Sequence, residues 1–305
     1  MKLGLITAPF PHWSLEQVAD WAATTGFEAL EICCWPPASG DARRYAGTTH
    51  IDVTRLTDRG AAEIRALLDD RGLSISALGY YPNNLHPDPA HRRAVNNHTK
   101  KVIEAAAKLG VATVCTFAGN DKDRPVPESL RDFERVFGRL VAHAEKHGVR
   151  VAIENCPMLF SYDEWPGGTN LAYSPAIWRQ LFELVPSTSL GLNFDPSHLV
   201  WQQIDCERAI YEFADRIYHV HAKDLELDRD GLYDHGVMSA GIGWQVPRLP
   251  GLGEVRWDRF FAALHGIGYD GPVIIEHEDR AFEGSDEAVI RGFRLARDVL
   301  SPYVV

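Results

Sequence analysis

Four side chains that can hold a metal ion come in succession along the chain, each at the end of a short apolar segment of β-type composition. They are Glu154, Asp195, His221 and Glu276. A carboxylate at the end of a buried strand is costly unless it is paired or bound to a metal. One such residue would be explained by a helix cap or an ion pair, but four in succession argue against that explanation. The segments are Val149–Asn155, Ser189–Asp195, Arg216–Lys223 and Pro272–His277.

Three carboxylates and one imidazole suit a hard or borderline divalent ion, Mg²⁺ or Mn²⁺ ahead of zinc. An octahedral ion with four protein ligands keeps about two open positions. Two neighbouring oxygens of a sugar would fill them. We therefore predict a single Mn²⁺ or Mg²⁺ ion and a small-molecule sugar substrate.

The elements that must position these residues alternate between strand and helix. Four further β-type segments precede the four above, which makes eight strands and predicts an α/β protein with a (β/α)8 TIM barrel fold. An open doubly wound sheet is the alternative, but no glycine-rich turn follows the first strand. The preceding strands are Lys2–Ala8, Phe27–Cys34, Leu73–Gly79 and Val111–Phe117; helical periodicity is clearest over Ser14–Thr25, Ala61–Arg71, Val95–Leu109, Ser129–His147 and Trp257–Ile267.

Helix boundaries carry local signals of their own. Ser14 with Gln17 three residues later is a capping box, which predicts the start of the first helix. Glycines that follow helices and precede strands fit the left-handed ends of helices, as at Gly26 and Gly110. In such a barrel the chemistry lies at the carboxyl ends of the strands, so the four candidate ligands should converge on one mouth.

One segment departs from this rhythm, because no convincing periodic element lies between Asp224 and Val255. Long loops in compact proteins are usually functional or disordered, and the aromatic and cationic residues here favour an ordered lid or substrate wall. We predict that Trp244 and Arg248 contact substrate from this segment. Lys223 and Asp224, directly after the metal-binding histidine, are further candidates for substrate contact, although a surface ion pair is an equal alternative.

Composition excludes several classes of protein. The 305 residues are 45% hydrophobic and 24% charged, as in a globular chain, and we treat residues 1–305 as one domain. The net charge of −11 argues against nucleic acid as the main partner. Five cysteines without metal-type spacing indicate reduced thiols and a cytoplasmic protein. No apolar run is long enough to span a membrane, so we expect no membrane partner.

The chain resembles the xylose isomerase-like barrels, which include sugar isomerases and epimerases, ketose 3-epimerases and endonuclease IV. This resemblance implies that Glu154, Asp195, His221 and Glu276 bind one divalent ion and that His198 faces the substrate. Because barrels of this family are often dimers or tetramers, the resemblance is also compatible with a homo-oligomer. The stretches that carry it are Ala152–Asn155, Asn193–His198, His219–Asp224 and Gly268–Pro272, followed by Ile275 and Glu276.

The resemblance to the 3-epimerases also implies that Glu154 and Glu276 move protons. A divalent ion stabilises an enediolate, so one glutamate can remove a proton beside a carbonyl and the other can return it. We therefore predict a metal-dependent sugar isomerase or epimerase acting on a keto sugar or keto-glycoside. A lyase that eliminates from 3-keto glycosides passes through the same enediolate and remains an alternative.

Two other readings have less support. An endonuclease IV-like repair enzyme needs histidines after the third and fourth strands, where Tyr80, Tyr81 and Phe117 stand instead. A non-catalytic sugar-binding barrel would have no reason to keep four costly polar strand ends. Both alternatives are therefore weaker than an enzyme with one metal site.

Overall fold

Eight parallel strands close into a barrel in a computed structural model that describes residues 1–37, 46–164 and 167–304. Around the barrel the strands follow the order β1-β10-β7-β6-β5-β4-β3-β2, so the fold is the expected (β/α)8 barrel. The barrel strands are β1 (Lys2–Ile6), β2 (Ala29–Cys33), β3 (Ser74–Gly79), β4 (Thr113–Thr116), β5 (Arg150–Glu154), β6 (Leu190–Phe194), β7 (Ile217–Ala222) and β10 (Pro272–Ile275).

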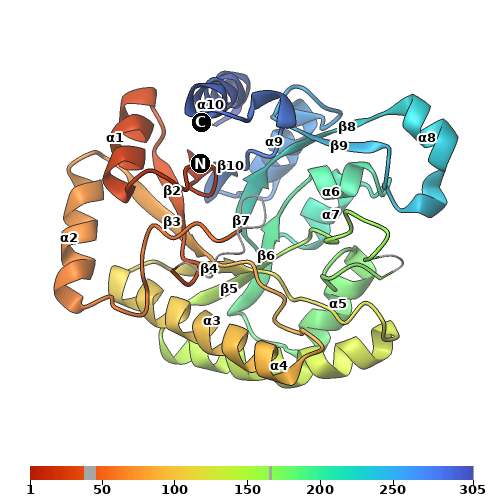
Figure 1. Ribbon diagram of the computed structural model, residues 1–305, viewed down its shortest axis with the longest axis horizontal. Helices are drawn as coiled ribbons and strands as arrows, with labels where there is room; N and C mark the ends of the chain where they lie inside the picture. Colours follow the sequence, from red (N-terminus) through yellow and green to blue (C-terminus); the bar gives the residue numbers. More distant parts are fainter. Residues whose placement is uncertain (38–45, 165–166, 305) are drawn as a thin grey trace.

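Helices cover the outside of the barrel (Figure 1). They bury their apolar faces against the strands, as in the aromatic cluster of Phe10, Trp21, Phe27 and Phe293. The helices are α1 (Leu15–Thr25), α2 (Asp58–Asp69), α3 (Pro89–Leu109), α4 (Val126–Lys146), α5 (Pro175–Leu184), α6 (Ser197–Val200), α7 (Cys206–Glu212), α8 (Arg229–His235), α9 (Trp257–Gly266) and α10 (Asp286–Leu300), with the 3-10 turns η1 (Val237–Ser239), η2 (Arg280–Phe282) and η3 (Ser301–Tyr303).

The predicted helix signals are confirmed. Ser14 and Gln17 form both hydrogen bonds of the capping box: the Ser14 hydroxyl accepts from the backbone N–H of Gln17, and the backbone N–H of Ser14 donates to the Gln17 side chain. Gly26 ends α1 at φ +89° and Gly110 ends α3 at φ +71°, the left-handed region that glycine enters without a steric penalty. Helix α3 begins at Pro89, six residues before the predicted start, because Asp88 caps it and proline is well tolerated in a first turn.

Small residues line part of the barrel interior. Ala77, Cys115 and Ala152 pack together there, and they leave room for larger polar side chains nearer the mouth. Gly79 also leaves room for a polar side chain, because a Cβ atom at this position would lie 2.5 Å from Oε1 of Glu31. The interior therefore accommodates a charged group that belongs to the second strand.

The segment Asp224–Val255 contains regular structure that periodicity did not reveal. Strands β8 (Asp224–Leu227) and β9 (Gln245–Arg248) pair antiparallel, and α8 and η1 lie between them. Two strands of four residues are too short to show an alternating pattern in the sequence. In Figure 1 this excursion projects beside the barrel at the upper right.

Asp224 fastens the excursion to the barrel. Its fully buried carboxylate accepts hydrogen bonds from the backbone of Leu225, Gly251 and Val255 and from Nε1 of Trp257, at 2.8 to 2.9 Å. Burial raises the pKa of Asp224, while these hydrogen bonds act in the opposite direction. The residue that begins the excursion thus also holds the residues that end it.

No helix among the described residues is both long enough and apolar enough to pass through a membrane.

We expect Asp224→Ala to lower the free energy of unfolding by about 3 kcal/mol, because buried donors would lose their acceptor. Thermal and urea unfolding measure this loss, and limited proteolysis should show faster cleavage within residues 228–244. Asp258→Ala, which removes an exposed carboxylate, is the control and should change little. Equal stability of the two variants would contradict the role given to Asp224.

Candidate metal centre and active site

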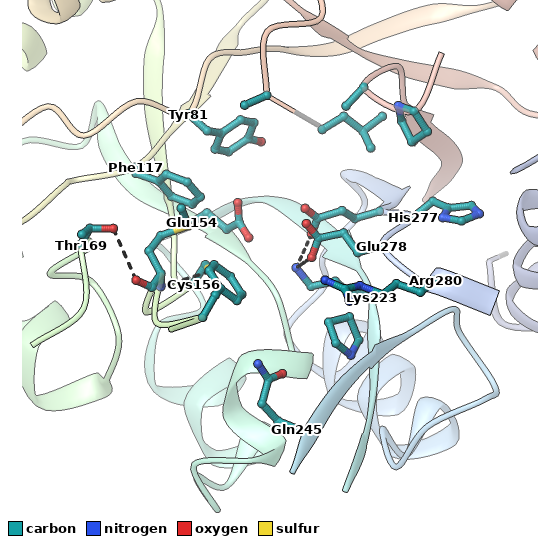
Figure 2. Close-up of a pocket in the computed structure, with 18 of the residues that line it drawn as sticks. Tyr81, Phe117, Glu154, Cys156, Thr169, Lys223, Gln245, His277, Glu278 and Arg280 are labelled. Atoms are coloured by element: carbon teal, nitrogen blue, oxygen red, sulfur yellow. Dashed lines mark hydrogen bonds and ion pairs between the residues drawn. The ribbon is translucent and has the colours of Figure 1, made fainter. Parts of the chain in front are cut away.

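A cavity of about 610 Å³ opens at the carboxyl ends of the strands (Figure 2). Glu154, Lys223, Glu276, Glu278 and Arg280 supply charged groups to its lining. The wall also includes apolar and aromatic side chains, among them Trp35, Tyr81, Phe117, Met158, Phe160 and Ile242. Polar groups at one site within a largely apolar wall are the common pattern of small-molecule pockets.

The closed barrel brings the four predicted ligands to one place. Glu154 ends β5, Asp195 follows β6, His221 lies in β7 and Glu276 follows β10, and these four strands are neighbours in the barrel. Single ligand atoms of Glu154, His221 and Glu276 lie within 4.8 Å of one another. Nδ1 of His221 is 3.7 Å from Oε2 of Glu154 and 3.3 Å from Oε2 of Glu276.

Lys223 connects Asp195, the fourth predicted ligand, to the others. Its ammonium lies 3.1 Å from Oδ2 of Asp195 and donates to Glu276 at 2.8 Å and to Glu278 at 3.2 Å. Figure 2 shows this side chain directed toward the carboxylates on one side of the pocket. The predicted Lys223 therefore belongs to the site as the counter-charge of three carboxylates.

These charges decide the protonation of the carboxylates. Burial alone would raise the pKa of Glu276, but the charges of Lys223 and His221 lower it to about 2. The pKa of Asp195 is likewise held below its ordinary value by Lys223 and His198 against the effect of burial. Burial would lower the pKa of Lys223, yet the surrounding carboxylates raise it well above its usual range. Glu276 and Asp195 are thus ionised near neutral pH.

Glu31 orients the histidine of the site. Its fully buried carboxylate lies 2.6 Å from Nε2 of His221 and accepts a hydrogen bond from the hydroxyl of Tyr81. A histidine that donates one ring N–H to a carboxylate keeps its other nitrogen for a metal. The second nitrogen of His221, Nδ1, faces Glu154 and Glu276 and has no hydrogen-bond partner among the described residues.

The residues present fit a divalent cation, because Nδ1 of His221 lacks a hydrogen-bond partner among the described residues and lies beside two carboxylates. Burial would lower the pKa of His221, but Glu31 and Glu276 raise it well above its ordinary value. Positive charge is therefore strongly favoured at Nδ1, where a metal ion would compete with a proton. Oδ2 of Asp195 is also buried, and the ammonium of Lys223 lies 3.1 Å from it as a counter-charge.

Sequence reasoning missed Glu31, although a signal was present. Within β2 the sequence Ala-Leu-Glu-Ile-Cys places a single carboxylate in an otherwise apolar strand. All five residues of that strand are buried, so the charge must have a partner. Such a partner lies 190 positions away in the chain and is brought close only by closure of the barrel.

His198 lies beside the carboxylates. Nε2 of this buried ring is 3.1 Å from Oδ2 of Asp195 and 3.6 Å from Oε1 of Glu154. The short helix α6 presents it, and the backbone of Ser197 at the start of that helix donates to Oδ1 of Asp195. The ring thus accompanies the two expected ligands, although it is not among the residues that line the cavity.

His219 is a packed residue of the barrel interior, two positions before His221 on the same strand. Nδ1 of its ring is 2.8 Å from Oδ1 of Asn193, and Nε2 is 3.1 Å from the hydroxyl of Ser76. Burial lowers its pKa to about 4, so the ring is neutral near neutral pH.

Three predicted substrate contacts lie in the framework rather than in the pocket lining. Asp224 holds the excursion, as described above, and Trp244 is buried against Trp201 with its Nε1 donating to the hydroxyl of Ser239. Arg248 pairs with Glu226 and, at 3.3 Å, with Asp279. Their polar groups are occupied by partners within the chain.

The same segment nevertheless forms part of the pocket wall. The pocket lining from it consists of Gly241, Ile242, Gly243, Gln245, Val246 and Pro247. These residues lie on both sides of Trp244, so the buried tryptophan supports a wall that its neighbours complete. The segment is ordered and lines the pocket, but Trp244 and Arg248, which were predicted to contact substrate, support this wall from behind it.

Glu31→Gln should weaken binding of Mn²⁺ or Mg²⁺ by about 10- to 100-fold, because a neutral amide orients His221 less well than a carboxylate. Isothermal titration of both ions measures the change. Tyr81→Phe keeps the carboxylate and removes only one hydrogen bond to it, so it should have a smaller effect. Unchanged affinity in the Glu31 variant would show that Glu31 has no such role.

Comparison with known proteins places this geometry among related barrels. The chain is 29% identical to the Uncharacterized protein YfiH of Bacillus subtilis, over 95% of this chain and 96% of that protein. It is 25% identical to a ketose 3-epimerase of Arthrobacter globiformis, over 70% and 66% of the two chains. It is also 25% identical to an inosose dehydratase of Geobacillus thermodenitrificans, over 82% and 83%.

The solved structures agree on the fold. A crystal structure of the IolI protein with a bound zinc atom superposes with a TM-score of 0.70 at 18% identity, over 99% of each chain. The family model for the xylose isomerase-like TIM barrel matches residues 19–299. This range begins within α1 and includes every barrel strand except β1. The chain therefore belongs to the xylose isomerase-like TIM barrel family.

Proposed function

We propose that this protein is a divalent-metal-dependent sugar isomerase or epimerase that acts through an enediolate on a keto sugar or keto-glycoside. The observation that carries the proposal is that the buried Glu154 and the partly buried Glu276 lie 3.7 Å and 3.3 Å from the same imidazole nitrogen, which lacks a hydrogen-bond partner among the described residues. Similarity to a ketose 3-epimerase supports the reaction class.

Glu154, Asp195, His221 and Glu276 would hold the ion. When bound, a divalent cation acts as a Lewis acid that stabilises negative charge on the oxygens of a keto sugar. The donor set is rich in oxygen, which favours Mn²⁺ or Mg²⁺. Lys223 would hold Asp195 and Glu276 in place and would remain charged.

Glu154 and Glu276 divide the proton transfers. They come from β5 and β10, which β6 and β7 separate in the barrel. The ionised Glu276 removes a proton from the carbon beside the carbonyl, and the electron pair of that C–H bond moves toward the carbonyl oxygen. Glu154 returns a proton to the opposite face of the same carbon for epimerisation. Return to the neighbouring carbon would instead interconvert aldose and ketose.

The pocket favours a substrate larger than a free monosaccharide. Its volume of about 610 Å³ lies within the range of roughly 300–1,000 Å³ of pockets that enclose drug-sized ligands. Trp35, Phe160 and Ile242 contribute apolar surface to the lining. A keto-glycoside would place its keto sugar against the glutamates and its second group against these side chains.

A second candidate reaction is elimination from the same enediolate. The similarity to an inosose dehydratase favours it. In that case Glu276 removes the same proton and passes it to the departing hydroxyl or alkoxyl group, which leaves as water or an alcohol. The two reactions are distinguished by product mass, because isomerisation conserves mass and elimination does not.

Substitution of the four proposed ligands tests the metal site. Glu154→Gln, Asp195→Asn, His221→Ala and Glu276→Gln should each lose most of their affinity for Mn²⁺, because three remaining ligands balance the charge poorly. Metal titration and elemental analysis measure occupancy. Glu164→Gln removes a different pocket carboxylate and should bind normally. Full occupancy in two or more of the four variants would overturn the assignment.

Solvent deuterium tests the reaction. With Mn²⁺ or Mg²⁺ and a panel of keto sugars and 3-keto glycosides in D₂O, deuterium should enter one carbon of the substrate or product, and a chelator should abolish its entry. Mass spectrometry and proton NMR follow the exchange. An isomerase that works by hydride shift would turn substrate over without this label, which would contradict the two-glutamate mechanism while leaving the fold unaffected.

A further inference from the structure

A group of metal-binding side chains lies on the outer helices, apart from the pocket. It consists of Glu104 on α3 together with His143 and His147 at the end of α4, and one ligand atom from each lies within 4.8 Å of the others. Nε2 of His143 is 3.1 Å from Oε1 of Glu104. The ring centroids of the two histidines are 4.7 Å apart.

The spacing of the histidines suits chelation. Residues four positions apart lie on the same face of a helix, so His143 and His147 present their rings side by side. Pairs of histidines at this spacing bind zinc in helical metal sites. Glu104 comes from the adjacent helix, and α3 and α4 pack alongside each other (Figure 1). Three ligands from two helices therefore converge without any rearrangement of the backbone.

The local electrostatics favour a cation. His143 lies in the last turn of α4 and His147 is its C-cap, where the free carbonyl groups of the helix carry partial negative charge. Glu104 adds a full negative charge. Lys100, Lys101 and Lys108 lie about one turn from Glu104 on α3, and Lys108 is turned toward Asp58 and the backbone of Leu56.

The cluster and the pocket lie at opposite ends of the barrel. Helix α4 ends at Lys146, shortly before β5 begins at Arg150, whereas the pocket surrounds Glu154 at the far end of that strand. Glu104 and His147 are exposed and His143 is half-buried, so an ion can reach the cluster from solvent. The amino-terminal end of such a barrel contributes to stability rather than to catalysis.

We propose that Glu104, His143 and His147 form a second divalent-cation site, suited to Zn²⁺, that joins α3 to α4. Two imidazoles and one carboxylate, with water as a fourth ligand, match the ligand types and number that zinc accepts. The oxygen-rich set in the pocket suits harder ions, so the two sites differ in preference. A bound ion would cross-link two helices that the chain otherwise connects only through β4 and its flanking loops. This inference is independent of the proposed reaction.

The test uses the full-length chain with the pocket site disabled by Glu154→Gln and His221→Ala. This background should bind one Zn²⁺ in a calorimetric titration, and Zn²⁺ should raise its melting temperature. Adding His143→Ala or His147→Ala should weaken this binding by at least about tenfold and abolish the rise, since the two-histidine chelate is lost. Glu104→Gln should weaken it less.

His91→Ala is the matched control. His86 and His91 also have adjacent rings, 4.2 Å apart, but Nδ1 of His86 already accepts from the backbone of Asp88. Zinc binding in this control should equal that of the background. The melting temperature without zinc verifies that each variant is folded. If the background binds no Zn²⁺, or if folded His143→Ala and His147→Ala variants bind it as tightly as the background does, the site is disproved.

Discussion

The balance of buried charge at the mouth of the barrel is the constraint on which the rest of the structure depends. Asp195 and Glu31 are fully buried, and Glu154 is only 2% exposed. Carboxylates removed from water must be matched by cations held at short distance, since an uncompensated buried charge is strongly destabilising. Lys223 and His221 supply that match, and both come from one strand and the residue that follows it.

The two cations carry different parts of this balance. Lys223 serves Asp195, Glu276 and Glu278 as a flexible point charge. His221 is held through one nitrogen by Glu31 and turns the other toward the carboxylates of Glu154 and Glu276. A divalent ion at that second nitrogen would replace a proton, so the same geometry that stabilises the metal-free chain also prepares the site for metal.

The wall of the pocket depends on the same strand. Lys223 points to the carboxylates, and the next residue, Asp224, gathers four hydrogen bonds from the excursion and from α9. Successive side chains on an extended segment point to opposite sides, which allows two neighbouring residues to serve the site and the framework. The position of the wall is thereby set by the chain that also carries the proposed metal ligand His221.

Much of this protein was determined by the sequence alone, because the signals concerned are local. Strand-helix alternation, the cap at Ser14 and the polar ends of four strands need only neighbouring residues to be recognised, and the barrel then brings Glu154, His221 and Glu276 together. The roles of Glu31, Trp244 and Arg248 were decided by tertiary structure. Each depends on a partner distant in sequence or on a neighbouring element: His221 for Glu31, Trp201 for Trp244, and Glu226 and Asp279 for Arg248. A side chain's type limits what it can bind, but its direction follows from packing that exists only after the barrel has closed.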